Sequence, residues 1–266
     1  SAGASRGESG EIWIATGFSG EDSSSGDINI HTGTGVSGSS GSITIAAGLA
    51  GVHRGGDVEI SSGGSTETSS GTIAITTANA GDFGTSGALQ LATGTSTGGS
   101  SGSISVESQD AQGGFGGGIS LVVGTGNSGP GGDIVIVAGD TNGGDGGALS
   151  LTSGASDSST GSIIIQSSNA GVAGSTGDIS LFSGVATADS SGSLTLATGD
   201  AIGSTSGSVA IYAGAGQSGV GGLVSVISGA SDDGSGTVTL MSGNAASAGS
   251  SGGVTIESGA ALASSG

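Results

Sequence analysis

The chain has 266 residues, of which 63 are glycine, one is proline and none is cysteine, and its formal net charge is −19. So few aromatic residues and so much glycine exclude an ordinary globular core, and the lack of cysteine excludes disulfides and thiolate metal sites. With only Arg6 and Arg54 as cationic side chains, the sequence predicts no nucleic-acid partner and no attachment to an anionic membrane. No apolar run approaches the roughly 20 residues of a membrane span, so membrane insertion is not expected either.

From Gly10 onward, one pattern recurs along the chain with a period of about 15 residues. Each copy reads Gly-x-aliphatic-x-aliphatic and closes on a second glycine. The opening glycine, which we call the corner glycine, is present in all seventeen copies, for example at Gly10, Gly41, Gly132 and Gly192. The closing glycine is present in fourteen copies and is replaced at Ala78, Gln109 and Ser168.

The two aliphatic residues of each copy form the candidate structural ladder. The first aliphatic residues are Ile12, Ile28, Ile43, Val58, Ile73, Leu89, Ile104, Ile119, Ile134, Leu149, Ile163, Ile179, Leu194, Val209, Val224, Val238 and Val254, and the second follow two positions later, as at Ile14, Ile45, Ile136 and Leu196. Alternation places both on one face of an extended segment, and the flanking glycines argue against helix. The next position on that face is Ser, Thr or Ala in every copy except Val123.

This regularity predicts an all-β fold in which seventeen repeats stack as a β-solenoid with parallel, in-register sheets and no caps. One repeat or two could form a coil. Two repeats in a coil of about 30 residues would let aliphatic ladders face each other, and weak alternation between odd and even copies favours this arrangement. One such signal is the outward position after the second aliphatic, which is large in several even copies.

The chain is expected to form a single continuous array over residues 1–266. It opens in mid-repeat and ends on the Ser-Ser-Gly that elsewhere introduces another copy, with no polar cap at either end. Uncapped ends invite further pairing. The sequence therefore predicts a segment of a longer solenoid or filament, with end-to-end assembly of identical chains.

No catalytic, cofactor-binding or metal-binding residue is predicted. The Gly-x-Gly-x-x-Gly run at 124–129 falls in the same phase as other corners and opens no helix, so it is not a dinucleotide fingerprint. His31 and His53 lie in different phases of the repeat and support no catalytic relay. The scattered carboxylates leave only weak Ca²⁺ bridging as an alternative to corner capping and solubility.

Large apolar residues at outward positions form a candidate lateral interface between chains. A stripe of exposed apolar side chains indicates contact with another surface. The residues are Val122, Phe182, Tyr212 and Met241. Abundant serine and threonine also leave attachment of O-linked glycan open.

Taken together, the glycine- and serine-rich repeats resemble β-solenoid proteins of the extracellular fibre and adhesin type, at the level of the class. The resemblance implies a structural, non-enzymatic protein that self-assembles outside the cell or on its surface. An adhesin stalk or an ice- or glycan-binding solenoid is the alternative, and a polysaccharide-active β-helix enzyme is the third reading. The near absence of lysine and arginine also predicts resistance to trypsin-like proteases.

Overall fold

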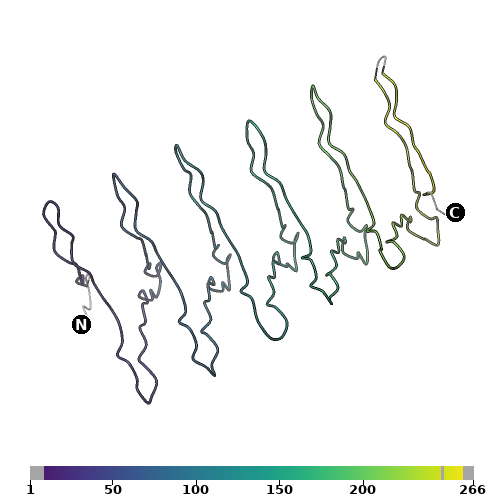
Figure 1. The fold of residues 1–266 in the computed structure, drawn as a ribbon. Coiled ribbons are helices and arrows are strands. Elements are labelled where there is room, and N and C mark those ends of the chain that lie inside the picture. The colour runs from purple at the N-terminus through teal and green to yellow at the C-terminus, as the bar shows by residue number, and fades with distance from the viewer. Residues whose placement is uncertain (1–8, 247–248, 260–266) are drawn as a thin grey trace. The chain divides into compact units, whose positions relative to one another are not determined.

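The computed structural model describes residues 9–246 and 249–259, and within these ranges the chain contains no helix and no strand. Extended segments alternate instead with chain reversals, as the trace in Figure 1 shows. The reversals within the described ranges lie at 21–22, 36–38, 51–53, 66–68, 82–83, 97–99, 112–114, 127–129, 142–144, 157–158, 172–173, 187–189, 202–204, 217–219 and 232–233. Their spacing follows the repeat, and one aliphatic pair lies between each two successive reversals.

The predicted all-β solenoid with parallel sheets is wrong for this chain. A strand is defined by hydrogen bonds to a neighbouring strand, and no two aliphatic segments are joined by such bonds in the described residues. The predicted coil of two repeats falls with it. The chain is instead rich in loops, and its extended segments find no partner on either edge among the described residues.

Each reversal is the tip of a hairpin whose two sides belong to consecutive copies of the repeat. The outgoing side is the end of one copy, and the returning side leads to the corner glycine of the next. We call the place where that glycine faces the preceding copy the neck of the hairpin. The third inward residue of the copy, the one that is Ser, Thr or Ala except at Val123, lies there.

Hydrogen bonds close several necks. In six of them the amide of the corner glycine donates to the carbonyl of the preceding closing glycine, for example from Gly222 to Gly214 at 2.9 Å. In three others the hydroxyl of the third inward residue donates to the carbonyl of the corner glycine, as from Ser108 to Gly117 at 2.9 Å. The other two such bonds come from Thr32 and Thr198. The repeat is thus held locally, between neighbours in sequence.

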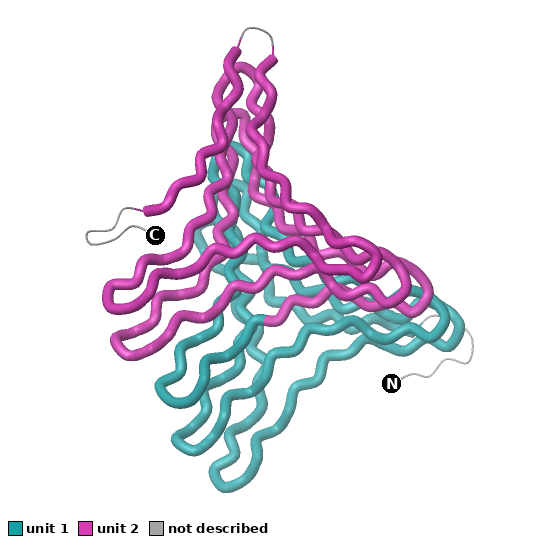
Figure 2. Tube along the Cα trace, turned by 90° about the vertical axis from the view of Figure 1, so that its right-hand side faces the viewer, with its two compact units in different colours: residues 1–134 teal, residues 135–266 magenta. Residues whose placement is uncertain are grey.

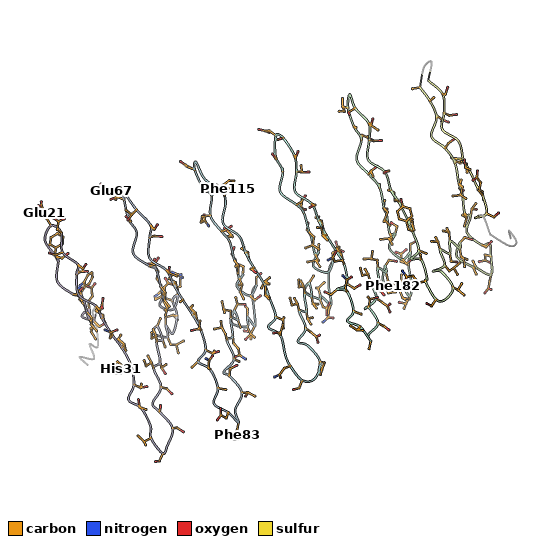
Figure 3. The ribbon with its side chains drawn as sticks, in the orientation of Figure 1. Glu21, His31, Glu67, Phe83, Phe115 and Phe182 are labelled. Carbon is orange, nitrogen blue, oxygen red and sulfur yellow. The ribbon has the colours of Figure 1, made fainter. Side chains whose placement is uncertain are left out.

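The chain divides into two compact units, Ser1–Ile134 and Val135–Gly266. In the first unit, Figure 3 shows Glu21, Glu67 and Phe115 on hairpins that point to the same side, and Phe83 on a hairpin that points to the opposite side. Glu21, Glu67 and Phe115 belong to hairpins that lie three copies apart in the sequence. Figure 2 shows hairpins leaving each unit, taken alone, in three directions. Three copies therefore make one circuit within a unit.

Candidate functional surface

The predicted ladder residues lie in the extended segments between hairpins, and none of them is buried. From Ile28 to Val254 the first aliphatic residue of each copy exposes 47–60% of its surface. The second aliphatic residue is more open, at 61–83% over all copies. By contrast, apolar side chains at the hairpin tips are almost fully exposed, with Val172 at 112% and Ile202 at 103%. The ladder is therefore the more sheltered apolar set of the chain but has no core of its own.

The structure gives a steric reason for glycine at the corner position of the repeat. In fourteen of the sixteen necks, a Cβ built on the corner glycine would lie within 4 Å of the third inward side chain of the preceding copy. At Gly222 such a Cβ would lie 3.0 Å from the Cβ of Ala213, and at Gly132 it would lie 2.9 Å from a methyl of Val123. At five corner glycines, Gly56, Gly117, Gly132, Gly147 and Gly222, the added Cβ would come closer than ordinary van der Waals contact, so these necks are too narrow for a side chain on both walls. At the others of the fourteen it would lie at ordinary contact distance.

The small third inward residue is evident in the sequence, but what it faces is not. The structure shows that this residue is one wall of the neck and the corner glycine is the other, about nine positions later, as with Thr32 and Gly41. The signal was present in the sequence. A small residue followed at a fixed distance by an invariant glycine is typical of two backbone segments that approach closely.

The four residues of the candidate lateral interface are all exposed and lie on different copies. Val122 exposes 83% of its surface, Tyr212 and Phe182 each expose 88%, and Met241 exposes 81%. Val122 belongs to the first unit and the other three belong to the second. Lateral contact through these side chains stays a prediction.

Charged side chains are distributed along the chain. Arg54 donates to a carboxylate oxygen of Asp57 at 2.7 Å along the returning side of one hairpin, and both side chains are exposed, so the pair is worth less than about 1 kcal/mol. Within residues 9–246 and 249–259, no three acidic or histidine side chains gather as a metal site would require. His31 and His53 are both exposed.

Residues 9–246 and 249–259 form no pocket, and the hydrogen bonds among them join residues at most nine positions apart. At one tip, for example, the Ser65 hydroxyl accepts the backbone amide of Thr68 at 2.9 Å. Such contacts shape single turns. The part of the chain that is described also offers no helix long and apolar enough to cross a bilayer.

The surface with the greatest chemical regularity is therefore the succession of half-exposed aliphatic pairs. Each pair lies between two glycine-lined necks, and the same arrangement recurs along both units. Such a surface can bury its aliphatic side chains against another surface whose apolar side chains recur at the same spacing. Comparison of the chain with protein-family models, curated proteins and solved structures found no significant match.

Proposed function

We propose that this chain is a structural segment that assembles with copies of itself into a fibre outside the cell or on its surface. The observation that supports this proposal is the exposed aliphatic pair, which recurs seventeen times with almost constant spacing. Burial of a large aliphatic side chain stabilises a protein by about 1.5–3 kcal/mol. Many equivalent pairs along one chain favour cooperative association with a surface of the same period.

Identical copies of the chain are the partners that best satisfy this requirement. A different protein would need the same period of about 15 residues over the same length, whereas a second copy has it by construction. Symmetric self-association is also the commonest form of protein assembly.

The location outside the cell is supported by composition. With only Arg6 and Arg54 as basic residues, the chain offers trypsin-like proteases two cleavage sites in 266 residues. Because the chain has no cysteine, its assembly also does not depend on the reduction or oxidation of thiols. A fibre exposed to secreted proteases benefits from both properties.

The proposal is tested by sedimentation and negative-stain imaging of the purified chain over a range of concentrations. The expected result is a rise in mean mass with concentration, with elongated particles visible at the upper end. A chain that sediments as a monomer and shows no particles up to about millimolar concentration would contradict the proposal. The wild-type chain is sufficient for this experiment, because no variant is needed to see association.

A further inference from the structure

The surface that the chain leaves open is far larger than a folded monomer can leave. A folded monomer of 24.0 kDa is expected to expose about 10,000 Å², and the same chain fully extended about 35,000 Å². The structure exposes 25,996 Å². Most of the area that folding normally covers is therefore still accessible, and the ladder pairs are part of it.

The backbone is equally unpartnered. Every backbone hydrogen bond between described residues spans at most eight positions, and the longest ones close necks, as from Gly56 to Gly48. None joins one ladder segment to another. Each segment thus presents free amides and carbonyls along both edges, which is the condition that favours pairing with an extended segment from another chain.

The direction of the hairpins indicates how many chains are needed. Within the first unit, hairpins three copies apart point the same way, as those carrying Glu21, Glu67 and Phe115 do. Successive copies of one chain therefore point in three different directions before the first direction is repeated. We call the height occupied by one copy along the unit a level. At each level a single chain places a hairpin in one of the three directions and leaves the other two directions empty.

We propose that three copies of this chain assemble in parallel around a common axis, each filling one of the three directions at every level. This inference rests on the proposed self-assembly. Along any one direction, the ladder segments then come from the three chains in turn, and the free backbone edges pair between chains. The arrangement differs from the solenoid expected from the sequence, because the neighbours of each segment belong to other chains.

The carboxylates next to the ladder do not prevent the aliphatic pairs of three chains from coming into contact. Asp27, Asp57, Asp133 and Asp178 each stand one position before a first aliphatic residue. Alternation along an extended segment turns them to the face opposite the ladder. The carboxylates thus remain in solvent while the aliphatic pairs of the three chains meet.

The number of chains is measured by mixing chains of two masses. Ordinary chain and uniformly ¹³C,¹⁵N-labelled chain are unfolded together, refolded and analysed by native mass spectrometry. The expected result is a smallest assembled species of about 72 kDa, three times the 24.0 kDa of one chain, that appears as four evenly spaced masses. Three masses at twice the chain mass would overturn the three-chain arrangement and leave self-assembly standing, whereas monomers alone would overturn both.

The length of that species provides a second, independent readout. Seventeen levels at a spacing of about 4.8 Å give a particle about 80 Å long when three chains share the axis. One chain that closed on itself with three copies in each level would be only about 27 Å long at the same spacing. Small-angle X-ray scattering of the separated species distinguishes the two lengths, and the shorter one would overturn the proposal whatever the mass.

Discussion

At the scale of single residues, a narrow neck gives a steric reason for the corner glycine in copies such as the one that begins at Gly222. At Gly222, an added Cβ would meet the Cβ of Ala213 at 3.0 Å and the backbone nitrogen of Gly214 at 3.4 Å. Neither neighbour can rotate away. The same glycine also donates the 2.9 Å hydrogen bond that closes the neck.

Substitution of this glycine by alanine is therefore expected to open the neck. We predict that Gly222→Ala lowers the free energy of unfolding of the assembled protein by about 1–2 kcal/mol, since it adds a steric contact and weakens one backbone hydrogen bond. Chemical denaturation of wild type and variant at the same chain concentration measures the change.

The matched control is Gly177→Ala, at the same position of another copy. A Cβ built on Gly177 finds nothing within 4 Å. This variant is expected to be neutral or to stabilise by about 0.4–1 kcal/mol, because alanine reduces the freedom of the unfolded chain. Equal destabilisation by both variants would show that the neck is not the reason for the invariant glycine.

At the scale of the extended segment, the account depends on the difference between ladder and tip. Ile73 is the first aliphatic residue of its copy and exposes 49% of its surface, whereas Ile202 lies at a hairpin tip and exposes 103%. The two residues have the same side chain. Only the first is expected to become buried when chains associate.

This pair of residues gives a matched test. We predict that Ile73→Ser raises the concentration needed for half-assembly at least tenfold, since a buried isoleucine contributes about 1.5–3 kcal/mol per chain. Ile202→Ser should change it less than about threefold, as expected of an exposed site. Concentration-dependent sedimentation measures both, and similar effects of the two changes would refute the special role of the ladder.

The sequence predicted the extended segments well because their signal is local. Alternating aliphatic residues between glycines define where a segment starts, which face is apolar and where the chain turns, as from Gly71 to Ile75. What a segment pairs with is not a local property. Period alone cannot distinguish a neighbour from the same chain from a neighbour in another chain, and for this reason the predicted solenoid was wrong.

At the scale of the whole molecule, charge and apolar surface act in opposite directions. Each chain carries a formal charge of −19, so association brings like charges together. Salt shortens the range of that repulsion, from about 30 Å at 0.01 M to about 8 Å at 0.15 M. The apolar contribution is affected much less over this range.

Assembly is therefore expected to strengthen with salt. We predict that raising NaCl from 0.01 M to 0.15 M lowers the concentration for half-assembly severalfold, which sedimentation at each salt concentration measures. CaCl₂ at equal ionic strength should have a comparable effect if the carboxylates act only as a diffuse charge. A much larger effect of Ca²⁺ would establish specific bridging, and weaker assembly at higher salt would contradict the role assigned to charge.

The residues of the candidate surface could be predicted from the sequence, but their exposure to solvent could not. Ile43, Ile45, Ile134 and Ile136 were identified from spacing alone, and they lie in extended segments as expected. Spacing implied that these side chains would be buried within one chain, and all four are exposed instead. The sequence did not reveal where each aliphatic pair finds a neighbour, because the period fixes the spacing of the pairs and not the segment that each one meets.

The most direct test of the central claim, that assembly buries the ladder, is limited proteolysis with thermolysin, which cleaves before large aliphatic residues. Both kinds of site occur in the same chain, so each digest contains its own control. In assembled protein, cleavage is predicted before tip residues such as Val52, Val172 and Ile202, whereas bonds before ladder residues such as Ile73 and Ile119 stay intact. Dilution below the assembly concentration removes that protection. Cleavage before ladder and tip residues at equal rates, at every concentration, would contradict the account.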